Sequence, residues 1–310
     1  MQQMSSLGTR PERLERVLQL TSLAALLGLF TIPHDGLAQT SPSPRSASTS
    51  GAAVYFIDIK NGAKLPSKAV IRFGLRNMGL APAGVLKVGT GHHHLLVDVG
   101  PPPLDRPIPN DPQHLHFGAG QTEAEVSLPP GEHALQLLFA DHDHVPHDPP
   151  LMSERILVVV EAEAPAPSGQ VASAPRAQDA GSSRKPADPE AAVYFVYPAD
   201  GAVIHPTSTI RFGLNKMGVA PAGVEKAGTG HHHLLVDVDT PQLNRPLPND
   251  PQHLHFGAGQ TEVKLTLPPG EHTLQLVLGD EHHVPHDPPV MSEKIKVLVR
   301  PGGPRGLRQF

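Results

Sequence analysis

Short runs of hydrophobic residues, separated by turn-forming residues, recur along most of the chain. The runs are rich in β-branched and aromatic side chains, and glycine, proline, asparagine or aspartate bounds each of them. This pattern is typical of β-strands, and no stretch has the period and length of a helix. In the first half of the chain the predicted strands are Val54–Ile57, Ala69–Phe73, His93–Val99, Ala124–Leu128, His133–Phe139 and Arg155–Val160.

The spacing of these strands predicts the fold class. Two of them are joined by Pro129-Pro130-Gly131, which indicates a tight hairpin turn. Six or seven short strands within about 110 residues are typical of an immunoglobulin-like β-sandwich with Greek-key connections. A closed β-barrel is the alternative that fits the same spacing. We therefore expect an all-β fold.

The chain contains the same domain twice. The segment GHHHLLVDV occurs at Gly91–Val99 and again at Gly230–Val238. Around it, each residue of the second copy follows its counterpart by 139 positions without a gap. An internal repeat of this length predicts two tandem β-sandwich domains. We place them at residues 52–161 and 191–300.

The N-terminal segment has the features of an export signal. Residues 1–38 contain three arginines, then an apolar run, then the small-x-small pattern Gly36-Leu37-Ala38. This order predicts a secretory signal peptide cleaved near Ala38, and an uncleaved anchor is the alternative. No other segment is apolar enough to cross a bilayer. We therefore expect a periplasmic or secreted protein with no membrane span in the mature chain.

Three further segments are rich in serine, proline or alanine and bury too little apolar surface to order themselves. They are residues 39–51, predicted as a disordered tether, residues 162–190, predicted as a disordered Pro/Ala-rich linker, and residues 301–310, a tail. The prolines of the linker predict a semi-extended conformation. The sequence thus predicts two domains that move independently on a flexible string.

Composition and charge exclude several classes of function. The net charge of −5, with 18% charged residues and no basic cluster within either repeat, argues against a nucleic-acid partner. The chain has no cysteine, which excludes disulfides, iron–sulfur clusters and thiolate ligands. Neither a G-x-S-x-G nor an H-E-x-x-H motif is present, and we expect no enzymatic activity.

The histidines carry the most distinctive chemistry of the sequence. Because side chains alternate along a strand, His92 and His94 should share the face opposite the core residue Leu95, about 6.5–7 Å apart along the strand. The same H-x-H pattern recurs at His114 and His116. Two imidazoles at this spacing can converge on one metal ion.

A third group of histidines lies in a proline-containing loop after a strand. His144 and His147 persist there between the two copies, whereas His142 is replaced by Glu281. We expect His133 and its counterpart His272 to be structural or solvent-facing. The candidate metal ligands are His92, His94, His114, His116, His144 and His147 in the first repeat, and His231, His233, His253, His255, His283 and His286 in the second.

The absence of cysteine limits the types of metal that the chain can bind. Imidazole suits several transition metals, and the absence of thiolates together with the expected export favours copper or zinc. Met78 and Met152, which recur in the second copy, could supply thioether ligands for copper(I), although such residues are more often core filler. Alternatively, the histidines form a buried hydrogen-bond network with carboxylates such as Asp98 and Asp141.

Four motifs in a fixed order connect the chain to a known family. Both repeats contain close matches to GHHHLLVD, PNDxxHLHFGAGQTE, LPPGEHTLQL and HVPHxPPVMSE. By these motifs the chain resembles a family of exported bacterial domains, domain of unknown function 4399, over residues 55–160 and 194–299. The resemblance implies a small, periplasmic or secreted β domain, usually present once, and it assigns no catalytic residue.

Together, these observations predict an exported protein in which each repeat binds a copper or zinc ion as a carrier or storage module. The alternative is a module that contacts a protein of the cell envelope and binds no metal.

Overall fold

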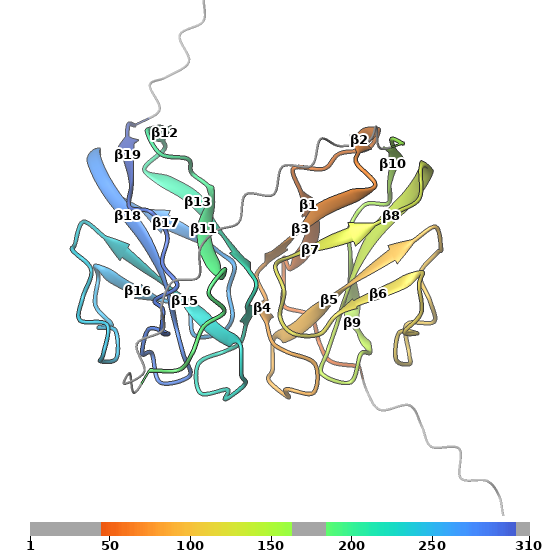
Figure 1. Cartoon of the computed structure of the whole chain (residues 1–310), viewed down its shortest axis with the longest axis horizontal. Helices are drawn as coiled ribbons and strands as arrows, with labels where there is room; N and C mark the ends of the chain where they lie inside the picture. The colour runs from red at the N-terminus through yellow and green to blue at the C-terminus, as the bar shows by residue number, and fades with distance from the viewer. Residues whose placement is uncertain (1–44, 163–183, 302–310) are drawn as a thin grey trace, which may run out of the picture. The chain divides into compact units, whose positions relative to one another are not determined.

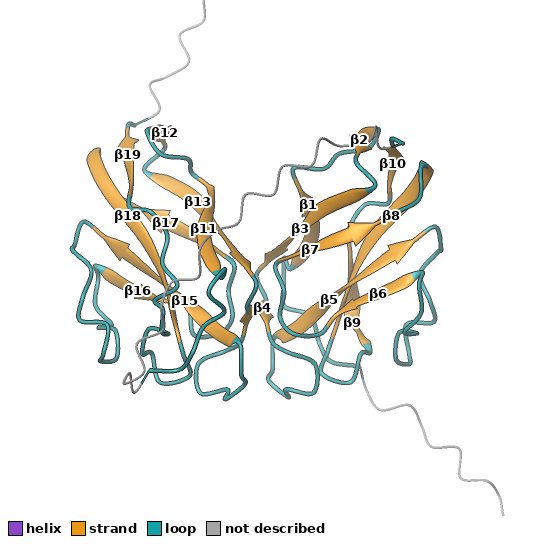
Figure 2. Cartoon of the chain, in the orientation of Figure 1, coloured by secondary structure: helices purple, strands orange, loops and turns teal. Residues whose placement is uncertain are grey.

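A computed structural model describes residues 45–162 and 184–301 of the chain. Within these residues every regular element is a β-strand (Figure 2). No helix long and apolar enough to cross a membrane occurs in this part of the chain. The predicted signal peptide, residues 163–183 of the predicted linker and the tail from residue 302 lie outside the described residues.

Each repeat contains two sheets (Figure 1). In the first repeat, the smaller sheet consists of β1 (Ala53–Ile57), β3 (Lys68–Arg76) and β7 (Glu123–Ser127). The three strands are antiparallel, with β3 in the centre. The first half of β3, residues 68–72, pairs with β7, and its second half, residues 72–76, pairs with β1.

The larger sheet carries the histidine-rich strands. Its strands are β2 (Ala63–Leu65), β10 (Ile156–Val160), β8 (Gly131–Ala140), β5 (Thr90–Val97) and β4 (Gly79–Leu80), in that order. In addition, β6 (His114–Phe117) pairs with β5, and β9 (Pro146–Met152) pairs with β8. Successive strands thus pass between two separate sheets. This topology confirms the immunoglobulin-like sandwich and overturns the closed-barrel alternative.

The second repeat has the same strand order but no counterpart of β9, in whose place Val277 and Gly279 form isolated bridges to Met291 and Pro285. Its smaller sheet has the order β11-β13-β17, and its larger sheet has the order β12-β19-β18-β15-β14, with β16 paired to β15. The strands are β11 (Ala192–Tyr197), β12 (Ala202–Ile204), β13 (Thr207–Asn215), β14 (Gly218–Val219), β15 (Thr229–Val236), β16 (His253–His255), β17 (Glu262–Thr266), β18 (Gly270–Gly279) and β19 (Ile295–Val299).

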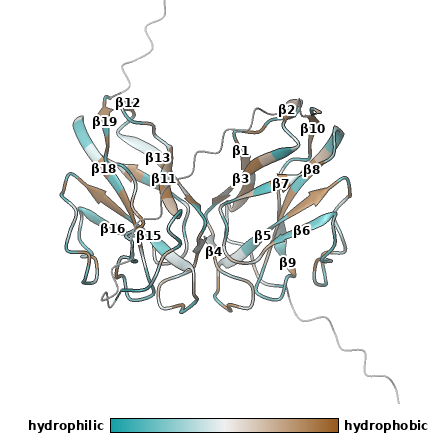
Figure 3. Cartoon of the chain, in the orientation of Figure 1, coloured by the Kyte–Doolittle hydropathy of each residue, from teal (hydrophilic) through white to brown (hydrophobic). Residues whose placement is uncertain are grey.

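The core of each sandwich follows from the alternation along the strands. In β3, Ile71, Phe73 and Leu75 are fully buried between the sheets, whereas Lys68 and Val70 are exposed. Figure 3 shows hydrophobic and hydrophilic residues following one another along the strands. Full burial of each large apolar side chain contributes about 1.5–3 kcal/mol.

Two segments that were expected to be disordered are ordered in part. Ser48 donates its backbone N–H to the carbonyl of Asp148 at 3.0 Å, and the Ser46 hydroxyl donates to Asp141 at 2.6 Å. In the second repeat, Asp287 donates its N–H to the carbonyl of Lys185 at 2.8 Å. The prediction of disorder is therefore wrong for residues 45–51 and 184–190. The composition of these segments shows that they have little apolar surface to bury. It does not show that their backbones hydrogen-bond to the folded repeats.

The two repeats also contact each other. The N–H of Leu80 donates to the carbonyl of Gly259, and the N–H of Val219 donates to the carbonyl of Gly120, each at 2.8 Å. The expectation of independent domains on a flexible string is therefore corrected.

Candidate metal centre

Strand β5 places histidines on both of its faces. All of its residues are buried. His93, Leu95 and Val97 point into the sandwich core, where the His93 ring lies 5.1 Å from the ring of Phe73. His92 and His94 point to the opposite face, as the alternation predicts. Both faces of the strand are therefore covered by protein.

Loops cover the face that carries His92 and His94. Leu96, on the same face, packs with Ile108 and Leu138 in a second small apolar cluster. Ile108 donates its backbone N–H to the carbonyl of His144 at 2.9 Å. The proline-rich loop after β5 is thereby tied to the histidine-containing loop after β8.

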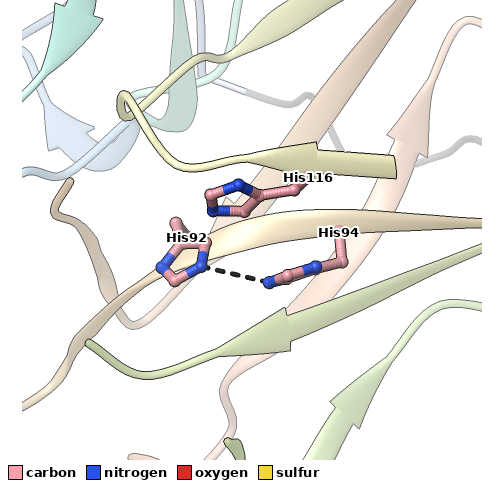
Figure 4. A group of neighbouring side chains, drawn as sticks. All are labelled: His92, His94 and His116. Carbon is pink, nitrogen blue, oxygen red and sulfur yellow. Dashed lines mark hydrogen bonds between the residues drawn. The ribbon is translucent and has the colours of Figure 1, made fainter. Parts of the chain in front are cut away.

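Four histidine rings meet beneath these loops. In the antiparallel pairing of β5 with β6, His94 lies opposite His116, and His144 closes the group from the loop after β8. The Nε2 atoms of His92 and His94 are 3.1 Å apart (Figure 4). Ring nitrogens of His92, His94 and His116 lie within 4.8 Å of one another. We call these four residues the four-histidine cluster of the first repeat.

The second repeat reproduces the cluster with His231, His233, His255 and His283. The Nε2 atoms of His231 and His233 are 3.0 Å apart. Ring nitrogens of His231, His255 and His283 lie within 4.8 Å of one another. The four rings therefore meet in both repeats, but the three nitrogens that converge in the second belong to the counterparts of His92, His116 and His144.

The four rings of each cluster are arranged like the corners of a tetrahedron. The six distances between ring centroids run from 4.8 to 5.9 Å in the first repeat and from 4.6 to 5.8 Å in the second. In a square-planar arrangement, two of the six distances would be about 1.4 times the others. In each cluster only one centroid distance is clearly longer than the others, 5.9 Å in the first repeat and 5.8 Å in the second, and it exceeds them by less than a factor of 1.4.

The backbone of His144 is held in an uncommon conformation. Its φ is +66°, and that of His283 is +67°. Asp141 fixes this turn, because its carboxylate accepts the N–H of Val145 at 3.0 Å and its carbonyl accepts the N–H of His144 at 3.0 Å. A left-handed backbone at a residue other than glycine persists only where the surroundings hold it. Asp141 therefore acts as the positioning residue of the loop.

Three rings of the first cluster, those of His92, His94 and His116, have lowered pKa values. Burial, followed by the neighbouring imidazoles, lowers the pKa of His92 to about 2 and that of His94 to about 3. The same causes act on His231 and His233. Burial also lowers the pKa of His116. Neutral imidazoles keep the lone pair that a metal ligand requires.

Several ring nitrogens of the first cluster have no protein partner. His92 Nδ1, His94 Nδ1 and His116 Nε2 are buried and accept or donate no hydrogen bond. Buried polar atoms are normally paired, so three such atoms in one cluster require an explanation. A donor set of imidazole nitrogens fits a transition-metal ion and does not fit calcium or magnesium, which prefer oxygen ligands.

The structure keeps the remaining candidate ligands out of the clusters. His114 and His253 pair with Asp111 and Asp250, each with Nδ1 2.9 Å from a carboxylate oxygen. His147 stacks on Phe139, with ring centroids 5.5 Å apart, and its Nε2 lies 3.2 Å from the carbonyl of Thr90. His286 contacts Thr229 in the same way.

The methionines and the remaining repeated histidines also lie elsewhere. Met78 belongs to the main core and Met152 packs on the second apolar cluster. His133, expected to be structural or solvent-facing, is structural: its Nδ1 lies 2.7 Å from Asp98 and its Nε2 lies 2.8 Å from the carbonyl of Pro129. All eight members of the two clusters are among the histidines that the sequence singles out.

Comparison with known proteins identifies the family and no activity. The family model described as Domain of unknown function (DUF4399) matches residues 71–161 and 210–300. No curated protein matches the chain. Fibronectin(III)-like modules of CbhA from Clostridium thermocellum share 10% identity, with 80% of this chain and 93% of that chain covered and a TM-score of 0.23.

A second solved structure, dimeric latent PorU from Porphyromonas gingivalis, shares 12% identity, with 84% of this chain and 20% of that chain covered and a TM-score of 0.26. TM-scores this low do not support a common fold, and the fold is assigned from the strand order instead. The two matched segments together span more than half of the chain. The chain therefore belongs to the DUF4399 family and carries two tandem copies of its domain.

Proposed function

We propose that each repeat binds one transition-metal ion through its four-histidine cluster, and that the chain is an exported carrier or storage module with two metal sites. The observation that carries this proposal is the convergence of four imidazoles in both copies. In the first repeat the ligands are His92, His94, His116 and His144. In the second repeat they are His231, His233, His255 and His283.

The spacing of the nitrogens supports a shared ion. Two imidazole ligands of one zinc ion, each about 2.0–2.1 Å from the metal, lie about 3.3 Å apart when the angle between them is tetrahedral, and closer when the angle is smaller. The Nε2 atoms of His92 and His94 are 3.1 Å apart, and those of His231 and His233 are 3.0 Å apart.

The other histidines of the chain show what a structural role looks like. His133 uses both ring nitrogens, with Asp98 and the carbonyl of Pro129 as partners. In the cluster, by contrast, a hydrogen bond between His92 and His94 leaves the Nδ1 atom of each ring without a partner. His133 is thus held by a carboxylate and a carbonyl, whereas the side chains of His92 and His94 hydrogen-bond only to each other.

The geometry favours zinc(II) or copper(I) over copper(II). Zinc takes four nitrogen or sulfur ligands in a tetrahedron, whereas copper(II) prefers a tetragonal arrangement. The nearly equal distances between ring centroids match the tetrahedral arrangement. When the fourth ring of a cluster also ligates, four protein ligands fill the coordination sphere of zinc, whereas a catalytic site keeps one position open. Binding or storage is therefore favoured over catalysis.

Metal analysis of the tag-free mature protein tests the proposal. After incubation with zinc and gel filtration, we expect two zinc ions per chain by elemental analysis. The double variant His92→Ala/His94→Ala should retain one ion, and the addition of His231→Ala/His233→Ala should remove the second. His114→Ala with His253→Ala is the matched control, because these rings pair with aspartates outside the clusters; it should keep both ions.

Two outcomes would refute the proposal. One is the absence of stoichiometric uptake of zinc or copper at neutral pH. The other is uptake that survives in the quadruple variant. Either result would favour the alternative function, a module that contacts a cell-envelope protein. Export is tested separately, by locating the protein in the periplasmic or extracellular fraction of its source.

A further inference from the structure

Two glycines of the domain are explained only by the opposite repeat. A Cβ atom added at Gly79 would lie 1.7 Å from the carbonyl oxygen of Ala258, and one added at Gly218 would lie 1.7 Å from that of Ala119. Neither glycine has a positive φ. Within the same repeat, the added Cβ lies 3.3 Å from Thr90 Cγ2 at Gly79, a tight contact, and 3.5 Å from Thr229 Cγ2 at Gly218, an ordinary one. The severe clash at both positions therefore comes from the other repeat.

The backbone contacts around these glycines are reciprocal. Leu80 of the first repeat donates to Gly259 of the second, and Val219, the counterpart of Leu80, donates to Gly120, the counterpart of Gly259. A threonine adds a second pair of contacts. The Thr122 hydroxyl donates to the carbonyl of Leu214 at 2.9 Å, and the hydroxyl of its counterpart Thr261 donates to the carbonyl of Leu75 at 3.3 Å.

A cluster of polar side chains makes contacts between the repeats that are reciprocal in the same way. The Tyr55 hydroxyl donates to Glu262 at 2.5 Å, and Arg211 donates its Nε–H to the Tyr55 oxygen at 3.0 Å. With the roles exchanged, the Tyr194 hydroxyl donates to Glu123, and Arg72 donates to the Tyr194 oxygen at 3.0 Å.

The geometry of the two polar groups is nearly identical. Each arginine lies over the tyrosine ring of the opposite repeat, with its Cζ atom 5.7 Å from the ring centroid. Burial, followed by the hydrogen bond to glutamate, raises the pKa of both tyrosines to about 12. Both hydroxyls therefore remain protonated donors.

We propose that this face is a homodimerisation surface that the tandem repeat uses within one chain. Every contact above recurs 139 residues later with the roles of the two repeats exchanged, which is the signature of a two-fold, isologous interface. The partner that such a face fits is a second copy of the same domain. The chain is therefore a fused dimer, and its covalent linker is not what holds the two domains together.

Cleavage of the linker tests this proposal on the whole chain. A specific protease site is inserted within residues 163–183, the purified protein is cut, and the mass of the product is measured by light scattering after gel filtration. The two halves should remain associated at the mass of the intact chain. Separation of the wild-type halves at about 10 μM, a concentration at which a specific interface of micromolar affinity holds, would overturn the proposal.

Matched glycine variants identify the face. Gly79→Ala with Gly218→Ala places two methyl groups against opposing carbonyls, and we expect it to weaken the association of the cut halves at least tenfold. Gly100→Ala is the control, because an added Cβ there meets nothing within 4 Å and the φ of Gly100 is not positive; it should leave the halves associated. Equal association of both variants would refute the assignment of this face.

Calorimetry of the uncut chain gives a second readout that requires no variant. If the interface joins the repeats into one cooperative unit, the calorimetric and van't Hoff enthalpies of unfolding should agree. Two repeats that unfold independently would instead give a calorimetric enthalpy about twice the van't Hoff enthalpy. That ratio would contradict a fused dimer, whether or not either repeat binds metal.

Discussion

Acidification of the metal-free protein should unfold it, because three neutral histidines are buried in each repeat. Burial lowers the pKa of His92 to about 2 and that of His93 and His94 to about 3. In the unfolded chain, the ordinary pKa is about 6.5. Between these values the unfolded chain binds protons that the folded chain excludes. The free energy of unfolding is therefore unaffected by these rings above pH 6.5, and it decreases as the pH falls below that value.

The size of the loss follows from the pKa values. At pH 5.0 each of these rings favours the unfolded state by about 2 kcal/mol relative to neutral pH, since its folded pKa lies well below 5. Three such rings give about 6 kcal/mol per repeat, which is comparable to the whole stability of a typical domain. His133 acts in the opposite direction. Although burial opposes it, the hydrogen bond to Asp98 raises its pKa, and its contribution is lost as the pH rises.

Guanidinium denaturation followed by circular dichroism, in the presence of a chelator, measures this loss at pH 7.5 and pH 5.0. The variant His93→Phe isolates one ring, because the His93 ring lies 5.1 Å from both Phe73 and Phe139 and neither of its nitrogens has a partner. Removing this ring should reduce the pH-dependent loss by about 2 kcal/mol. His232→Phe should do the same in the second repeat.

The reasoning would be refuted if the free energy of unfolding changed by less than about 1 kcal/mol between the two pH values. It would also be refuted if His93→Phe left the loss unchanged. In either case the buried rings would have to accept protons without unfolding.

Three further predictions test the site and its surroundings. In Gly118→Ala, the added Cβ would lie 2.2 Å from His116 Nε2, so zinc affinity in the first repeat, measured by calorimetric titration, should fall at least tenfold; unchanged affinity would argue against His116 as a ligand. His133→Ala should lower the free energy of unfolding by about 1.5–3 kcal/mol, through loss of the contact with Asp98, while zinc stoichiometry stays the same. Zinc at one hundred times its dissociation constant should stabilise the fold by about 2.7 kcal/mol, seen as a shift of the denaturation midpoint. No shift with bound zinc would mean that zinc binds the unfolded chain equally well.

The sequence predicts the local features of the fold. Strand alternation depends only on the two-residue period of an extended chain, so the separation of His92 and His94 from Leu95 follows from the sequence itself. The internal repeat likewise predicts two sandwiches, because two copies of nearly the same sequence adopt the same fold. Each of these features is encoded within a few residues or by comparison of the two copies.

The choice among the candidate ligands depends on tertiary structure. His114 and His116 have the same H-x-H spacing, but the register between β5 and β6 places His116 opposite His94, and Asp111 pairs with His114. His144 joins the cluster because Asp141 holds its backbone in a left-handed turn. Strand register is set by contacts between segments far apart in the chain, and the left-handed turn at His144 is set by Asp141 within its own loop; the H-x-H spacing encodes neither.

The pairing of the repeats is the clearest case in which composition misleads. A linker rich in proline and alanine indicates independent domains, because composition describes the linker and not the surfaces that it joins. The sequence by itself determined two copies of a histidine-rich β-sandwich. Only the tertiary structure decided which four rings converge in each copy and that the copies close on each other through Gly79 and Gly218. Both depend on shape complementarity between segments far apart in the chain.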